Sequence, residues 1–349
     1  MRHGNTTQDH MALLKACTKK KDICRGSTLH AQIRQRGLLL EGHPYIASSL
    51  INMYAKCGML TKAQQVLEEI PTRNVVCWNA LISGYSREGK IHEALKGLNQ
   101  MKYEGFCPNG ITYTSILSAC GKTREIHKGK QIHDEILYRG LLEDDIMLGT
   151  ALVDMYAKCG FLSIAQKVLK EQHIRDVVSW SALIAGFAQE GQGHEALYCF
   201  EEMQSEHLSP DAITLASILK ACGTIGAIDK GKHIHEEIVR LALLGDDIVL
   251  GNALVDMYVK FGMLEKARQV LDNLSYRNVI TWSTLIAGFS QHGEGREALH
   301  HFQQMQSEGI SPNPVTLICV LNACGSMGAI NKGKQLHSEI LSRGLLETN

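Results

Sequence analysis

The chain repeats itself every 102 residues. The segments VVCWNALISGYSREGKIHEAL, VVSWSALIAGFAQEGQGHEAL and VITWSTLIAGFSQHGEGREAL begin at residues 75, 177 and 279. All three tryptophans, Trp78, Trp180 and Trp282, occupy the same position in these copies. A fixed period is typical of arrays in which each unit buries its apolar face against its neighbours. The period therefore favours one continuous array over two separate globular domains.

Each copy reads as two amphipathic helices joined by a glycine-containing turn. In 177–211 the first half places four apolar residues at i, i+3, i+4 and i+7, on one helix face: Trp180, Leu183, Ile184 and Phe187. Gly191 and Gly193 interrupt this helix, and a second amphipathic run follows before Pro210 ends the unit. Because helices of about a dozen residues are marginal alone in water, the hairpins must stack on one another. The sequence predicts an all-α solenoid.

Two further hairpin types lie between the tryptophan copies, so the period consists of three unequal repeats. The 35-residue type covers 75–109, 177–211 and 279–313. The 36-residue type covers 110–145, 212–247 and 314–349, and a variant at 7–43 is one residue longer. The 31-residue type covers 44–74, 146–176 and 248–278. We therefore expect a single array of ten hairpins over 7–349, after a leader at 1–6.

The charge balance bounds the kinds of partner. Lys plus Arg and Asp plus Glu are 36 each, and the pI is about 7.2. A strongly basic protein that binds nucleic acid regardless of sequence has a pI above about 9. Any nucleic-acid binding by this chain must therefore depend on local geometry. No apolar run reaches the roughly 20 residues of a membrane span, so no membrane partner is expected. Residues 1–6 show no targeting peptide.

Two sequence patterns resemble catalytic motifs, but each lacks residues that the motif requires. His-x-Glu, half of a zinc deaminase signature, occurs at 133–135, 235–237 and 337–339, but no Cys-x-x-Cys accompanies it. A phosphate-loop pattern begins at Gly226 and at Gly328, but His233 and Gln335 stand where a hydroxyl residue is required. The sequence therefore predicts a non-enzymatic chain with no catalytic residue, metal or cofactor.

Repeats of three lengths in fixed order, with Trp-Asn-Ala-Leu-Ile-Ser-Gly-Tyr at 78–85 and Tyr-Ala-Lys-Cys-Gly at 54–58, resemble the pentatricopeptide repeat family. The resemblance covers 7–349 and is closest to the plant subclass with alternating P, L and S repeats. Tetratricopeptide repeats share the hairpin but run at 34 residues. We denote the 35-, 36- and 31-residue hairpins P, L and S repeats. The resemblance implies a right-handed superhelical solenoid that binds single-stranded RNA, one base per repeat.

In the family the second residue of a repeat packs on a base, and the fifth and last residues select the base. The second residues here are Tyr45, Val76, Ile111, Met147, Val178, Ile213, Val249, Ile280 and Val315. The fifth and last residues form the pairs Ser48/Asn74, Asn79/Asn109, Thr114/Asp145, Thr150/Asp176, Ser181/Asp211, Asn252/Asn278 and Ser283/Asn313. All six P and S fifth residues are small and polar, which helix propensity does not require. Met11, Ala216 and Ile318 break this pattern in L repeats.

The family's pairing preferences translate these residues into an RNA sequence. Ser or Thr with Asn implies adenine, Ser or Thr with Asp implies guanine, and Asn with Asn implies cytosine over uracil. The expected site is 5′-A-Y-G-G-G-n-Y-A-n-3′, in which the L repeats contribute least. A simpler interpretation also exists for the last residues, because Asn and Asp are favoured helix N-caps wherever they precede a new helix. Capping does not explain the choice between Asn and Asp.

The resemblance implies a role in mitochondrial or plastid RNA processing, most often as the site-recognition module of C-to-U editing. A deaminase would then act in cis, in a C-terminal extension, or in trans, and L repeats would contact editing cofactor proteins. A second class of function stays open at this point, a helical scaffold that binds protein partners on the same surface.

Overall fold

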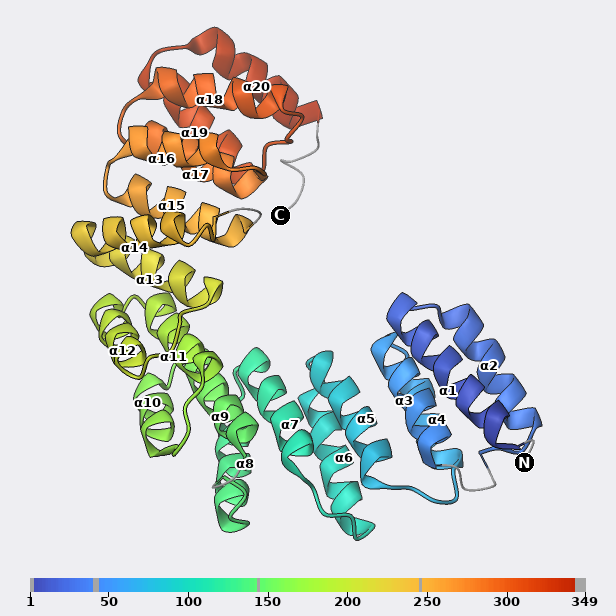
Figure 1. Cartoon of the computed structure of the whole chain (residues 1–349). Coiled ribbons are helices and arrows are strands. Elements are labelled where there is room, and N and C mark those ends of the chain that lie inside the picture. Colours follow the sequence, from blue (N-terminus) through green and yellow to red (C-terminus); the bar gives the residue numbers. More distant parts are fainter. Residues whose placement is uncertain (1–2, 40–43, 143–144, 245–246, 343–349) are drawn as a thin grey trace. The chain divides into compact units, whose positions relative to one another are not determined.

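The computed structural model describes residues 3–39, 44–142, 145–244 and 247–342, and these contain helices but no strand (Figure 1). The all-α solenoid prediction is confirmed. The twenty helices are α1 His3–Lys20, α2 Ile23–Gln35, α3 Pro44–Lys56, α4 Leu60–Glu69, α5 Val75–Arg87, α6 Ile91–Tyr103, α7 Gly110–Thr123, α8 Ile126–Tyr138, α9 Ile146–Lys158, α10 Leu162–Glu171, α11 Val177–Gln189, α12 Gly193–Ser205, α13 Ala212–Ile225, α14 Ile228–Arg240, α15 Ile248–Lys260, α16 Leu264–Asn273, α17 Val279–Gln291, α18 Gly295–Ser307, α19 Pro314–Ser326 and α20 Ile330–Ser342.

The chain divides into two compact units, Met1–Ser179 and Trp180–Asn349. In the first unit α1, α3, α5, α7 and α9 pack in series, each on the next. In the second unit α13, α15, α17 and α19 do the same. Helices α2, α4, α6 and α8 in the first unit, and α16 and α18 in the second, each pack on the helix before and the helix after. Each unit therefore has a continuous layer of first helices, which positions the candidate site.

The first helices begin where the sequence places an Asn or Asp. Eight of these side chains accept a hydrogen bond from a backbone N–H of the first turn: Asn74, Asn109, Asp145, Asp176, Asp211, Asp247, Asn278 and Asn313. The capping prediction is confirmed for these eight, and Asn349 lies outside the described residues. Helix α1 begins at His3, inside the stretch predicted as a leader.

The third tryptophan copy shows how a hairpin is filled. Trp282 is buried, and its indole N–H donates to Glu308 at 3.1 Å. The buried ring of His301 stacks on Phe289, with ring centres 4.9 Å apart, and lies beside Trp282. Gly293, with φ of 79°, allows the left-handed turn between α17 and α18. Among the described helices, none combines the length and apolarity that a bilayer crossing requires.

A histidine–tyrosine contact recurs at each described junction between an L and an S repeat. The imidazole Nδ1 lies 3.0 Å from the tyrosine hydroxyl in His30–Tyr54, 2.9 Å in His133–Tyr156 and 2.8 Å in His235–Tyr258. Burial lowers the pKa of each of these histidines below its ordinary value. As the pH falls, each of these histidines therefore binds a proton at a higher pH in the unfolded chain than in the folded one, which lowers stability at low pH.

Stability is expected to fall as the pH drops below about 6.5. The unfolded chain takes up protons at this pH that the half-buried imidazoles of His133 and His235 do not bind, so protonation favours unfolding. Urea denaturation at about pH 7.5 and about pH 5.5 measures the effect. A variant carrying His133→Gln and His235→Gln should lose less stability between the two pH values. An equal loss in the variant would contradict the assignment.

Candidate nucleic-acid interface

Exposed apolar side chains recur along the first helices of each unit. They are the second residues of nine helices, 53–69% exposed: Tyr45, Val76, Ile111, Met147, Val178, Ile213, Val249, Ile280 and Val315. Single exposed aliphatic residues are common, but the same exposed position in nine successive first helices is not needed for the core. We call these nine residues the wedge row. All nine sequence-predicted packing residues are therefore accessible to a ligand.

A hollow of about 200 Å³ lies between two members of the wedge row in the second unit. Ile213 and Val249 both line it, and the fifth residue Ala216 lines it together with Lys220. A planar group in this hollow would have an aliphatic side chain on each face and a cation nearby. The hollow is therefore a natural position for one base of a single strand, with no polar fifth side chain to select it.

The P repeats bring their fifth and last residues into direct contact. Asn79 Nδ2 donates to Asn109 Oδ1 at 3.1 Å. Ser181 Oγ donates to Asp211 Oδ1 at 3.2 Å, and Ser283 Oγ lies 3.4 Å from Asn313 Oδ1. Asn79, Ser181 and Ser283 are 5–7% exposed. Residues 30 positions apart in the sequence thus form one small polar site at the surface of each P repeat.

The S and L repeats are less uniform. Thr150 Oγ1 donates to Asp176 at 3.3 Å, which gives a fourth direct pair. Ser48 donates instead to the Tyr45 carbonyl oxygen at 3.1 Å. The Oδ1 of Asn252 and the Oγ1 of Thr114 are buried without a hydrogen-bond partner. The structure therefore joins four of the seven predicted pairs and leaves Ser48/Asn74, Asn252/Asn278 and Thr114/Asp145 without that contact.

The last residues cap their helices with only one side-chain atom. In all eight caps the accepting atom is Oδ1, whether the residue is Asn or Asp. The second atom, a donor Nδ2 in Asn and an acceptor Oδ2 in Asp, is not among the buried unpaired atoms of the described residues. Capping therefore leaves the second atom of each side chain available for base selection, and the two interpretations are compatible.

Three threonines that sequence reasoning missed complete the P-repeat sites. Thr112, Thr214 and Thr316 are the third residues of the following L repeats, and all three are fully buried. Each hydroxyl contacts both the last residue and the fifth residue of the preceding P repeat. Their recurrence at the 102-residue period is the one signal in the sequence that could have indicated them.

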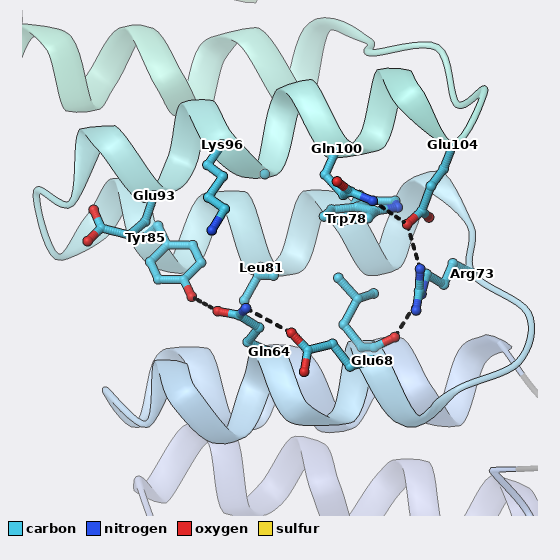
Figure 2. A pocket seen from close by; sticks show the side chains of 12 residues that line it. Gln64, Glu68, Arg73, Trp78, Leu81, Tyr85, Glu93, Lys96, Gln100 and Glu104 are labelled. Carbon is cyan, nitrogen blue, oxygen red and sulfur yellow. Dashed lines mark hydrogen bonds and ion pairs between the residues drawn. The ribbon is translucent and has the colours of Figure 1, made fainter.

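A second cavity, of about 350 Å³, lies on the second-helix side of 75–109 (Figure 2). It exists because Gly97 occupies the position that His301 fills in the third copy. The polar side chains around it bond one another: Tyr85 donates to Gln64 at 2.6 Å, and Arg73 and Glu104 form an ion pair (Figure 2). This cavity holds no paired nucleophile and base and is separate from the wedge row.

The His-x-Glu triplets have structural partners. His133 and His235 contact tyrosines, as described above, and Glu135 accepts from Lys102 at 2.6 Å and from Tyr113 at 2.8 Å. Residue 339 lies where the structure does not describe side chains. Across the described ranges, no group of three His, Cys, Asp or Glu side chains converges on a possible metal position.

Comparison with known proteins agrees with this geometry. The PPR repeat family matches residues 73–122, 175–224 and 277–326, and the PPR repeat matches 45–75, 111–141 and 252–279. The chain is 34% identical to the Arabidopsis thaliana pentatricopeptide repeat-containing protein At2g03380, mitochondrial, over 100% of this chain and 50% of that protein. It is 35% identical to the Arabidopsis thaliana protein At4g18520, chloroplastic, over 97% of this chain and 54% of that protein. The chain thus spans about half the length of these relatives.

Among solved structures, the chain is similar to the pentatricopeptide repeat protein PPR10 in complex with an 18-nt psaJ RNA element. The TM-score is 0.73 at 22% identity, over 89% of this chain and 47% of that one. At this identity the likeness demonstrates a shared fold.

Proposed function

Because the chain belongs to the PPR repeat family, we propose that it binds single-stranded RNA along its first helices and selects bases through the fifth and last residues of its repeats. The observation that carries the proposal is the alternation of two kinds of surface. Apolar members of the wedge row are exposed in nine repeats, and the fifth residues of the polar pairs lie three residues further along the same helices. Aliphatic packing supports every base equally, whereas the polar pairs discriminate.

The hydrogen bonds within the P repeats give each pair a distinct outward pattern. Asn79 Oδ1 accepts from Thr112 and one Asn79 N–H goes to Asn109, so the pair offers only N–H donors outward. Cytosine presents two adjacent acceptors, N3 and O2, whereas uracil places the N3–H donor between its two carbonyls. The Asn79/Asn109 pair therefore favours cytosine over uracil.

The two serine pairs follow the same logic. Ser283 donates to the Val279 carbonyl oxygen, so its oxygen can only accept from outside, while Asn313 retains an N–H donor. One acceptor beside one donor matches the N6–H and N1 of adenine. Asp211 replaces the amide donor with a second acceptor, and two acceptors match the N1–H and N2–H donors of guanine. The RNA proposed for the array is 5′-A-Y-G-G-G-n-Y-A-n-3′.

Selection from a random single-stranded RNA pool tests this function without assuming a register. Enrichment of RNAs that contain G-G-n-Y-A supports it. A pool that stays unenriched, together with retention of a protein partner after alanine replacement of Asn79, Ser181 and Asn252, would favour a protein-binding scaffold.

At a finer level we propose that the RNA-binding surface serves organellar RNA processing, as the recognition module for C-to-U editing. The proposal draws on the named relatives, two of which are described as mitochondrial and chloroplastic. The deaminase would be supplied by a further segment of the protein or by a partner, and L repeats would contact editing cofactor proteins.

A further inference from the structure

Each P repeat is followed by a buried threonine that touches both of its base-selecting residues. Thr112 Oγ1 lies 2.6 Å from Asn79 Oδ1 and 3.1 Å from Asn109 Oδ1. The corresponding contacts of Thr214 are 2.5 Å to Ser181 and 2.7 Å to Asp211. Those of Thr316 are 2.6 Å to Ser283 and 2.8 Å to Asn313. The three sites therefore share one hydrogen-bonded triad.

Other junctions between repeats lack this triad. Where an S repeat precedes a P repeat, Ser179 and Thr281 bond the last residues Asp176 and Asn278 but make no hydrogen bond to a fifth residue. Where an L repeat precedes an S repeat, the third residue is Ile46, Leu148 or Leu250, which has no hydroxyl. The triad is thus specific to the P-to-L junctions.

In the first triad the hydroxyl determines which way the Asn79 amide points. The Asn79 oxygen accepts the single proton of Thr112, and one Asn79 N–H donates to Asn109. A reversed amide would place N–H groups against the hydroxyl and leave Asn109 Oδ1 without the Asn79 donor. Without the hydroxyl, the two orientations of the Asn79 amide differ by only one hydrogen bond. Asn79 then presents an N–H donor outward in one orientation and the amide oxygen, an acceptor, in the other.

Asn252 provides the contrasting case in the same chain. It forms the same Asn–Asn pair by sequence, with Asn278, but its Oδ1 is buried without a partner. Thr281, the next third residue, bonds only Asn278. Two repeats with identical selecting residues therefore differ in whether a hydroxyl holds the fifth side chain.

We propose that the third-residue threonine of each L repeat that follows a P repeat is a positioning residue that sets base discrimination by that P repeat. This inference rests on the proposed RNA binding. It assigns part of the specificity of one repeat to a buried residue of the next, so two residues per repeat are not sufficient to define the code.

The test is equilibrium binding of the full chain to RNAs that differ only at the base facing Asn79/Asn109 or Asn252/Asn278. Thr112→Val removes the hydroxyl at nearly constant shape. The preference for cytosine over uracil at the Asn79 position is expected to fall about tenfold, while Thr112→Ser retains it. In the wild type the Asn252 position should discriminate less than the Asn79 position.

Thr281→Val is the matched control, because Thr281 forms the same capping box with Asn278 but does not contact Asn252. It should leave cytosine–uracil discrimination unchanged at both positions. Unchanged discrimination in Thr112→Val, or an equal loss in Thr281→Val at its own position, would overturn the proposal. If Thr112→Val does not fold, equal discrimination at the two wild-type positions would also overturn it. A wild-type chain that binds no RNA would contradict the proposed function instead.

Discussion

Replacing Asn109 with aspartate is expected to change the base preferred at the second position of the site from cytosine to uracil. The last-residue cap should survive, because Asn109 caps α7 with Oδ1 and aspartate has the same atom. The outward Nδ2 donor becomes an acceptor, while the Asn79 N–H next to it is unchanged. One donor beside one acceptor matches a uracil carbonyl and the N3–H, and no longer matches the two acceptors of cytosine.

The size of the change follows from the cost of a mismatched base contact. A good pair of hydrogen bonds to a base contributes about 1–3 kcal/mol of discrimination, so the cytosine-to-uracil ratio should change by about tenfold to a hundredfold. Competition between two RNAs that differ at this base measures it. Asn109→Ala controls for the cap, which contributes about 1 kcal/mol to stability. A ratio that does not change in Asn109→Asp would show that this residue only caps the helix.

Removing the apolar contacts of the wedge row should weaken binding to every RNA without changing the fold. Threonine keeps the β-branch of Ile213, Val249, Ile280 and Val315 but puts a hydroxyl in place of a methyl or ethyl group, and all four residues are 53–61% exposed. If each aliphatic contact contributes about 0.7 kcal/mol, below the roughly 1–3 kcal/mol of aromatic stacking, the four together reduce affinity about a hundredfold. The ratio between cognate and mismatched RNA should stay constant, because these contacts do not read base edges.

The control for this variant lies on the second helices of the same unit. Val239 and Ile330 are 57% and 68% exposed, on α14 and α20, outside the wedge row. Val239→Thr with Ile330→Thr should leave RNA affinity unchanged, and thermal denaturation should show both variants folded. Equal loss of affinity in the two variants would mean that binding follows general surface apolarity, which would contradict a specific row.

The features that the sequence predicted are those determined by neighbours along the chain. The apolar spacing around Trp180 is a property of one helix, and an Asn or Asp cap acts within the first turn, so both are visible in a short window. The exposure of the wedge row follows from the same spacing, because the second residue lies opposite the buried face. The paired helices of the repeats were therefore predictable without any long-range contact.

The features that the sequence did not predict depend on contacts between repeats. Thr112 lies 33 residues from Asn79, and only the packing of α5 on α7 brings its hydroxyl to that amide. The cavity beside Trp78 depends on the absence of a side chain at Gly97, which periodicity does not reveal. The division into two compact units falls after Ser179, where the repeat pattern continues without interruption. The single array over 7–349 stays a prediction.

The central claim is that the order of polar pairs encodes an RNA sequence. Its most direct test is the affinity of the chain for 5′-ACGGGACAA-3′ and for a scrambled RNA of the same composition, at about 150 mM salt, because electrostatic attraction contributes equally to both. The proposed pairing predicts that the ordered RNA binds about a hundredfold more tightly than the scrambled one. Equal affinities would contradict it.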